Sequence, residues 1–507
     1  MQKHLTALAF RNCIIALLLL NPALSIVVPA QPIGVFDNHE DIGNPKLKGS
    51  AVYDVNMQTY TMSGAGKNMW TKDDQFHFAW KKIKGDFIIK ATVRFIGKGT
   101  NPHRKIGIIA REKLTADSRY ADACVHGESL TSLQYRASDG DTTGQVIISS
   151  YNPTEIELER SGNTLTFSAA TFGETYKSVT KDIRLAEDVY AGLFICSHEE
   201  NVMEQAVFSN VRIIIPAAKD FRPYRDYIGS HIEIMDVFTG LSKIIHSASN
   251  SLQAPNWTPD NKYLIYNADG LMYRYDLSNN NITKINTGFA KDNNNDHVLS
   301  FDGKTLGISH YVAPNHTSTI FTLPVTGSAN PTKITEDTAG HSYFHGFSPD
   351  GKRMIFTGYR NKEWNIWAID LATKKETQLT EAPPLNDGAE YTPDGKYIYF
   401  NSARTGTMKI WRMKADGSEE EQITFDEYND WFPHISPDGK WIVYESFPKE
   451  IDPLTHPFYK RIYLRLMPVK GGGPKTIGYV YGGQGSINVP SWSPDSKKIA
   501  FVSNSKL

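Results

Sequence analysis

Short runs in which apolar and polar residues alternate follow one another along the chain, separated by glycine, asparagine and aspartate. Residues 59–62, 85–95 and 190–195 are three such runs. Alternation with a period of two puts successive side chains on opposite faces of an extended chain, so each run predicts a half-buried β-strand. No stretch of residues 31–216 shows three turns of helical periodicity. The pattern predicts an all-β protein.

The first part of the chain, residues 31–216, has no internal repeat. Its predicted strands are short and numerous, and turn residues lie between them. Antiparallel strands that each bury one face stack as two sheets. We therefore predict a jelly-roll-like β-sandwich over residues 31–216.

A six-residue phrase recurs in the second part of the chain. It consists of an aromatic or aliphatic residue, Ser or Thr, Pro, Asp, usually Gly, and Lys. Proline presets φ, aspartate can bond its own backbone and glycine accepts positive φ, so the phrase predicts a tight hairpin turn. An apolar run follows most copies, and the copies recur every 42 to 57 residues. This is close to the period of a four-stranded propeller blade, so six copies predict six blades. The copies are 257–262, 299–304 (degenerate, without proline), 347–352, 391–396, 435–440 and 492–497.

The two ends of the repeat array predict how the propeller closes. The chain stops just after the strand at 499–503, so the last blade has two inner strands and needs two outer ones. A hairpin at 231–246, before the first turn phrase, can supply them. Such an interlock closes the ring and removes exposed sheet edges. We expect a linker at 217–229 and a six-bladed propeller at 230–507.

The N-terminus predicts export. Lys3 and Arg11 precede the apolar run 14–20, and small residues follow it. The run is too short to span a bilayer, so residues 1–30 are predicted to be a signal peptide, and no later stretch is predicted to cross a membrane. The mature protein would be periplasmic or extracellular. It would keep Cys124 and Cys196, and the sequence leaves open whether they form a disulfide.

The overall charge of the chain argues against one class of partner, nucleic acids. The chain has 54 Lys and Arg residues against 55 Asp and Glu residues, a formal net charge of −1. Nucleic-acid binding usually depends on a marked basic excess. We therefore expect no nucleic-acid partner.

The strand order of the first domain resembles that of secreted concanavalin/laminin-G-like sandwich domains. The matching runs are 70–80, 85–95, 107–111 and 207–213. Many members of that fold bind or cleave glycans, and many do neither. The resemblance implies a carbohydrate-related role as one expectation.

The repeats resemble the TolB-like β-propeller family over about residues 230–507. Blades of that family carry the Trp-Ser-Pro-Asp-Gly-Lys phrase, an apolar strand and then a strand such as 365–370 or 409–413. The resemblance implies a six-bladed propeller. Family members include periplasmic interaction proteins, and related propellers include polysaccharide lyases and peptidase gates. No Gly-x-Ser-x-Gly elbow of an appended hydrolase is present.

The residues just before each turn phrase are unusually polar. In a propeller these strand starts surround the central channel, so residues far apart in sequence would meet there. Concave sites with convergent polar groups are the default place for a ligand. The candidates are His297, His341, His345, Asn386, Asp387, Glu390, Asn429, Asp430, His434 and Asn488.

One chemistry that fits this set is a metal centre. Neutral imidazoles bind divalent metal ions, which makes His297, His345 and His434 candidate ligands of such a cofactor. A metal could acidify a sugar proton next to a uronate, with His434 or His345 as the base.

Paired carboxylates are the other chemistry. Asp387 or Glu390, together with Asp430, could act as acid and base in hydrolysis of a glycosidic bond. The structural alternative for each residue is that it caps backbone groups or ties neighbouring blades together. Sequence does not rank these alternatives.

A long insertion at 447–461 lies between the last two turn phrases. Long loops on rigid scaffolds often contribute to function. The alternative is a solvated loop whose charges face water. Candidate substrate-binding residues here and nearby, suited to an anionic sugar or a carboxylate, are Arg404, His456, Tyr459, Lys460, Arg461 and Asn488.

The sequence supports two hypotheses for the function. The leading hypothesis is glycan recognition outside the cytoplasm, with carbohydrate cleavage of the lyase or hydrolase type at the propeller mouth. The alternative is a non-catalytic propeller that docks a protein partner. A deep pocket holding the predicted histidines and acids favours the first, and a flatter face with exposed apolar residues favours the second.

Overall fold

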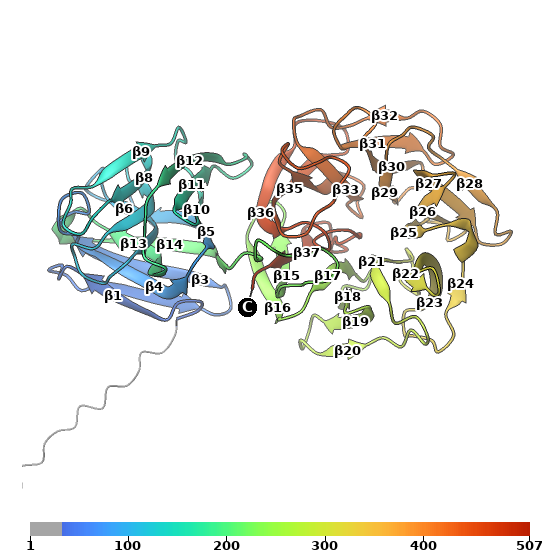
Figure 1. Cartoon of the computed structure of the whole chain (residues 1–507), viewed down its shortest axis with the longest axis horizontal. Coiled ribbons are helices and arrows are strands. Elements are labelled where there is room, and N and C mark those ends of the chain that lie inside the picture. Colours follow the sequence, from blue (N-terminus) through green and yellow to red (C-terminus); the bar gives the residue numbers. More distant parts are fainter. Residues whose placement is uncertain (1–32, 507) are drawn as a thin grey trace, which may run out of the picture. The chain divides into compact units, whose positions relative to one another are not determined.

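The computed structural model describes residues 33–506, whose regular structure is almost entirely β-strand (Figure 1). Within this range the exception is one short 3-10 helix, η1 (Asp337–Ala339). No helix in residues 33–506 is long and apolar enough to cross a membrane. The predicted signal peptide, residues 1–30, lies outside the described residues.

The first fourteen strands form two antiparallel sheets. Each sheet has seven strands within the described range. The first, in spatial order, is β1 (Asn38–Ile42), β4 (Phe76–Lys84), β13 (Asp188–Cys196), β6 (Lys105–Arg111), β7 (Tyr120–His126), β8 (Thr131–Arg136) and β9 (Gly144–Ile147). The second is β12 (Lys177–Asp182), β11 (Thr164–Ala170), β10 (Glu155–Ser161), β5 (Phe87–Ile96), β14 (Glu199–Ile214), β3 (Thr59–Gly66) and β2 (Ser50–Asp54).

These two sheets share one hydrophobic core. Ile106 and Ile108 face it from β6 of the first sheet, and Leu158 and Phe167 face it from β10 and β11 of the second. Burying one such side chain contributes about 1.5–3 kcal/mol, so a core of this kind holds the sheets face to face. The alternation of apolar and polar residues in the sequence arises because every second side chain of these strands faces this core.

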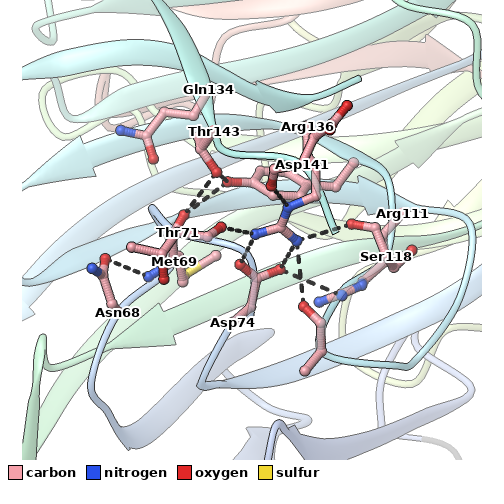
Figure 2. A network of polar contacts seen from close by, with 12 residues as sticks. Asn68, Met69, Thr71, Asp74, Arg111, Ser118, Gln134, Arg136, Asp141 and Thr143 are labelled. Atoms are coloured by element: carbon pink, nitrogen blue, oxygen red, sulfur yellow. Dashed lines mark hydrogen bonds and ion pairs between the residues drawn. The ribbon is translucent and has the colours of Figure 1, made fainter. Parts of the chain in front are cut away.

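A buried ion network lies on the opposite face of the first sheet (Figure 2). The Asp74 carboxylate accepts hydrogen bonds from both terminal nitrogens of Arg136, at 2.7 and 2.8 Å, and Arg111 lies 3.5 Å away. All three side chains are fully buried. Arg136 also donates to the carbonyls of Thr71 and Ser118, at 2.6 and 3.1 Å. The network fixes the loop before β4 to strand β8.

The two cysteines of the first sheet, Cys124 on β7 and Cys196 on β13, are free thiols. Cys124 and Cys196 are both buried, and no disulfide joins them. Burial raises the pKa of the Cys196 thiol to about 11. The pairing question that the sequence leaves open is thereby answered.

The remaining strands form the six sheets of a β-propeller, counted over residues 230–504 (Figure 1). The strands of the first three four-stranded blades are β17 (Leu252–Trp257), β18 (Tyr263–Ala268), β19 (Leu271–Asp276), β20 (Ile282–Lys284), β21 (Asn293–Leu299), β22 (Thr305–Val312), β23 (Thr317–Pro324), β24 (Thr332–Lys333), β25 (Ser342–Phe347), β26 (Arg353–Arg360), β27 (Glu363–Asp370) and β28 (Glu376–Gln378). Those of the next two are β29 (Asn386–Tyr391), β30 (Tyr397–Ser402), β31 (Lys409–Lys414), β32 (Glu421–Gln422), β33 (Asn429–Ile435), β34 (Trp441–Phe447), β35 (Lys460–Pro468) and β36 (Lys475–Gly482).

The turn phrase closes the hairpin between the first two strands of each of these five blades, as predicted. In the third blade Asp350 accepts hydrogen bonds from the Ser348 hydroxyl at 2.6 Å and from the Lys352 amide at 3.1 Å. The residue after the aspartate has positive φ, and Asn261 and Ser496 adopt it without being glycine, at 61° and 58°. The local chemistry of the phrase therefore accounts for the repeated turns.

The sixth sheet closes the ring largely as predicted. Its order is β16 (Ser242–Ala248), β15 (Ser230–Asp236), β37 (Lys498–Asn504), so the N-terminal hairpin pairs with the C-terminal strand. One detail of the prediction is wrong, since the expected innermost strand is not a full strand. Within the described residues it is reduced to a single bridge between Trp492 and Ile499, and the sheet has three strands.

The innermost strands of the other five blades are irregular. Their register with the second strand shifts between Gln253 and Asn256, and between Asn293 and His297, and at matching places in the other three blades. A β-bulge of this kind bends the strand and re-aims its side chains. The bulges decide which residues face the propeller axis.

Candidate functional site

The innermost segments of all six blades surround one cavity of about 870 Å³. A cavity of this size suits a ligand of a few sugar rings or a comparable small molecule. The linker and the long insertion also reach it, through Tyr224, Tyr227, Leu454, His456 and Phe458. The propeller lining comprises Ser251, Gln253, Asn267, Asp269, Gly270, Asp292, Asn293, Asn294, Asn295, Asp296, Tyr311, His316, Tyr343, His345, Thr357, Trp364, Pro384, Leu385, Asp387, Trp431, Phe432, Gln484 and Asn488.

A histidine and an aspartate from neighbouring blades meet on the wall of this pocket. His345 Nε2, from β25, lies 2.9 Å from Asp387 Oδ1, from β29. Asp387 Oδ1 also accepts hydrogen bonds from the Thr357 hydroxyl at 2.6 Å and the Gly388 amide at 2.8 Å. Burial opposes charge on both groups, but their mutual attraction raises the pKa of His345 and lowers that of Asp387. Each group of the pair therefore favours the charged form of the other.

Asp296, on β21, is the second acid of the pocket. Its side chain lines the cavity although the residue is only 7% exposed. No donor in the described part of the chain hydrogen-bonds its carboxylate. Burial, to which the negative charge of Asp387 adds, raises the pKa of Asp296 to about 6. Among the pocket carboxyls, burial thus favours the protonated form of Asp296, and the contact with His345 favours the ionised form of Asp387.

His456 enters the pocket from the long insertion. The structure buries this side chain, with one ring nitrogen against Glu445 of β34 and the other against Gln484. Burial opposes its charge, but the Glu445 carboxylate raises the pKa of His456. Its ring packs between Trp431 and Phe432, at centroid distances of 5.0 and 4.8 Å. The insertion is therefore anchored in the propeller at this point.

Aromatic rings form much of the remaining wall. Tyr311 stacks on His316 at a centroid distance of 4.1 Å, and Tyr343 lies 5.6 Å from Trp364. Tyr224 of the linker packs edge-on against Phe458 of the insertion at 5.1 Å. Amide side chains line the same cavity.

Four of the predicted site residues lie on the pocket wall and four lie behind it. His345, Asp387, His456 and Asn488 line the cavity. His434, Glu390, Asp430 and His297 are buried in the blades and do not line it. The sequence expectation that all these side chains face one pocket is met only by the first group.

Each residue behind the wall is held by the fold. His434 donates from Nε2 to the Ile487 carbonyl at 2.5 Å, and its Nδ1 lies 2.6 Å from Glu390. Asp430 accepts from the Ser446 hydroxyl at 2.6 Å. His297 is 0% exposed, and burial lowers its pKa to about 4. These contacts fit the structural alternative stated for strand-start residues.

The other predicted substrate-binding residues also lie away from the cavity lining. Arg404 pairs with Glu420 and donates to Asn386 at 2.9 Å. The Tyr459 hydroxyl accepts from the Ile228 amide at 3.1 Å, and Lys460 is exposed at the start of β35. Arg461 forms ion pairs with Glu159 and, at 2.8 Å, with Glu157.

The predicted metal ligands do not assemble. Across residues 33–506, no group of three or more His, Cys, Asp or Glu side chains is arranged to hold a metal ion. His345 lies on the cavity wall, while His297 and His434 are buried behind it and are occupied by protein contacts. We propose no reaction step that involves a metal ion.

Sequence reasoning missed several lining residues. Asn295, Asp296, Tyr343 and Trp364 line the cavity, and none of them is among the candidates that the sequence pattern indicates. Asp296 stands six residues before Asp302 of the degenerate turn phrase, a position that Phe344, Gly388 and Phe432 occupy in the next three blades. An acidic residue at a position that is apolar in these other blades is the sequence feature that could have identified Asp296 as a candidate site residue.

Comparisons with known proteins match the propeller. A family profile described as the TolB beta propeller domain matches residues 311–452. An uncharacterized protein of Agrobacterium fabrum is 42% identical over 274 residues, which cover 54% of this chain and 92% of that protein. A solved candidate TolB structure from Agrobacterium tumefaciens is 41% identical with a TM-score of 0.53, covering 56% of this chain and 100% of that one. TolB from Acinetobacter baumannii is 17% identical with a TM-score of 0.40, covering 64% and 79%.

Proposed function

Because this chain belongs to the TolB-like β-propeller family, we propose that its propeller works as a ligand-binding ring whose central pocket takes up an oligosaccharide outside the cytoplasm. The observation behind the proposal is the single cavity of about 870 Å³ to which all six blades contribute. Pockets that bury most of a small ligand have this size and shape. The export signal predicted at residues 1–30 supports a location outside the cytoplasm.

The composition of the wall supports a sugar. Aromatic rings such as Trp364, Tyr343 and Tyr311 offer flat apolar faces on which sugar rings can stack. Amide side chains such as Asn294 and Gln484 also line the cavity and can hydrogen-bond hydroxyl groups. A flat docking face for a folded protein would not need this depth.

The two acids of the pocket support hydrolysis as the reaction to test. Environments that push two carboxyl pKa values apart provide an acid and a base in one site. Asp296, with its pKa raised to about 6, would protonate the leaving group, and ionised Asp387 would act as base or nucleophile. Elimination next to a uronate needs cations around the sugar carboxylate. Among the described residues the lining contains no Lys or Arg.

The sandwich domain extends the proposal. We propose that residues 31–216 are a concanavalin/laminin-G-like domain that adds a second contact to the glycan. The support is its two seven-stranded antiparallel sheets around one core, together with the strand order seen in the sequence. Deleting this domain should weaken binding to long glycans more than binding to short ones.

The test is calorimetric titration of the purified mature protein with a panel of short oligosaccharides. We expect binding to at least one, and loss of binding in Trp364→Ala, which removes a wall ring. Trp411→Ala, a propeller tryptophan outside the lining, is the matched control. Product formation is then followed by mass spectrometry in wild type and Asp387→Asn. A protein that binds no saccharide in the panel contradicts the proposal.

The family supplies the second candidate, a non-catalytic propeller that binds a protein partner. In that case an extended peptide from the partner would occupy the same cavity. Peptide binding with no saccharide binding in the same titrations would favour this alternative.

A further inference from the structure

We propose that the sugar bound in the central pocket carries a free amine, so that the preferred ligand is an amino sugar with a protonated amino group. This inference rests on the proposed function, because it names the class of saccharide that the pocket selects. It follows from the charge of the wall, from one unpartnered carboxylate and from the arrangement of rings and amides.

The pocket has an excess of acidic groups. Its lining contains Asp269, Asp292, Asp296 and Asp387 and, among the described residues, no Lys or Arg. Unpaired charges near a low-dielectric wall attract ligands of the opposite sign. A ligand that carries a carboxylate would meet repulsion here, and one that carries an ammonium group would meet attraction.

The histidines do not cancel this excess. His345 pairs with Asp387 at 2.9 Å. His456 pairs with Glu445, which lies behind the wall, and His316 lies 3.1 Å from Asp292. Every lining imidazole therefore already has a carboxylate partner.

Two carboxylates remain without a cation. Asp269 contacts only a neutral amide, Asn250, at 2.6 Å among the described residues. Asp296 is more than nine-tenths buried and lines the cavity, and its carboxylate has no hydrogen-bond donor in residues 33–506. A buried polar group without a partner destabilises the protein, more so when it is charged, and a ligand that pairs with it recovers this cost. Burial opposes ionisation of Asp296, and a bound ammonium group would favour it, so the acid role proposed for Asp296 applies to sugars that place no free amine beside it.

Aromatic faces complete a site for a cation. Tyr343 and Trp364 lie 5.6 Å apart, and Tyr311 lies on the same wall. An ammonium group over such rings is attracted by the ring quadrupole. The same rings accept the apolar face of a sugar, so an amino sugar uses both properties at once.

Amide groups on the wall favour a hydroxyl-rich ligand over a simple amine or a lysine side chain. Asn267, Asn293 and Asn295 line the cavity, and each keeps one buried amide atom without a partner. The Asn293 orientation is fixed by its donation to the carbonyls of Gly270 and Ala290, at 2.8 and 2.9 Å, which leaves its oxygen free to accept. Small rotations of Asn267 and Asn295 would bring their free amide atoms to sugar hydroxyls. A lysine side chain has no hydroxyl groups that could pair with these amides.

The test compares three trisaccharides of similar size by calorimetry at pH 7 and low salt: one of glucosamine, one of N-acetylglucosamine and one of galacturonate. We expect the glucosamine trisaccharide to bind at least tenfold more tightly than its acetylated counterpart, and the galacturonate trisaccharide to bind most weakly. The preference should shrink at high salt, because screening weakens charge attraction.

Variants then assign the preference to the pocket. Asp296→Asn should reduce glucosamine binding at least tenfold and leave binding of the acetylated sugar nearly unchanged. Asp269→Asn is a second variant in case the first folds poorly. Glu427→Gln is the matched control, because this exposed carboxylate pairs with Lys449 outside the lining. Circular dichroism and thermal unfolding confirm that each variant is folded.

Each outcome decides between the two proposals. Equal binding of the acetylated and free-amine sugars overturns the inference but leaves glycan binding intact. Tightest binding of galacturonate overturns the inference in the same way. Binding of a lysine-containing peptide with no sugar binding, or no binding of any probe, overturns both.

Discussion

His345 Nε2 lies 2.9 Å from Asp387 Oδ1, and the two residues come from the innermost strands of adjacent blades. The contact links blades three and four across the pocket wall. It places this histidine–carboxylate pair on the same pocket wall as Asp296, a lining carboxyl whose pKa is raised. The pair therefore matters both for the stability of the ring and for the charge of the site.

Removing the carboxylate should change the titration of the histidine. In Asp387→Asn we expect the pKa of His345 to fall below its ordinary value of 6.5, because burial then acts with less opposition. Two-dimensional NMR of the imidazole resonances against pH measures this. Asp269→Asn, which changes a lining carboxylate that does not contact His345, is the control. An unchanged His345 titration in Asp387→Asn would contradict the pairing.

The same pair predicts a window of stability. The raised pKa of His345 gives stability that is present below 6.5 and is lost as pH rises through the folded-state value. The lowered pKa of Asp387 gives stability that is present above 3.8 and is lost as pH falls through its folded-state value. We expect the difference in unfolding free energy between wild type and Asp387→Asn to be largest between pH 3.8 and 6.5. A difference that grows steadily above this range would refute the assignment.

The pKa of Asp296 shifts in the opposite direction from that of Asp387, so its effect on stability has the opposite pH dependence. Its pKa rises from 3.8 to about 6 on folding, so the folded state binds more protons between these values and stability falls as pH rises through them. Asp296→Asn should lack this decline and should be more stable than wild type at pH 7, by on the order of 1 kcal/mol. Urea unfolding at pH 4 and pH 7 gives the comparison. A variant that is less stable than wild type at pH 7 would show that the carboxylate has a partner.

A variant of His434 tests whether this residue stabilises the fold or binds the ligand. Replacing it with alanine leaves Glu390 without its buried partner, so we expect a loss of about 2–4 kcal/mol in unfolding free energy. Ligand affinity should stay within about twofold of wild type, because His434 does not line the cavity. Denaturant unfolding and calorimetry measure the two effects. A folded His434→Ala protein that has lost binding would place this residue in the site after all.

The sandwich network gives a prediction away from the pocket. Asp74→Asn leaves Arg136 and Arg111 as uncompensated buried charges, which should cost about 3–5 kcal/mol. The exposed neighbour Asp73 offers a matched control, and Asp73→Asn should cost less than about 0.5 kcal/mol. Chemical unfolding followed by fluorescence reports both. Similar stability of the two variants would argue against the network.

The architecture of the propeller could be predicted because it depends on local chemistry. The Pro-Asp-Gly turn fixes its own hairpin wherever it occurs, and six copies at blade spacing specify the ring. The pairing of residues 231–246 with the last strand also followed from the sequence, since an unpaired terminal blade would leave exposed edges.

The pocket residues were harder to predict because bulges interrupt the alternation of the inner strands. In β21 the register shifts between Asn293 and His297, so the consecutive residues Asn295 and Asp296 both line the cavity. Strict alternation forbids this and would give His297 the position of a lining residue. A bulge adds a residue to one strand of a pair, and a pattern of period two does not reveal where that residue is added.

The most direct test of the account is a crystal structure of the protein with the glucosamine trisaccharide. We expect the sugar in the central cavity, with its amino group next to the Asp296 carboxylate and a ring against Trp364. Sugar bound only to the sandwich domain, or a cavity that stays empty at saturating ligand, would contradict it.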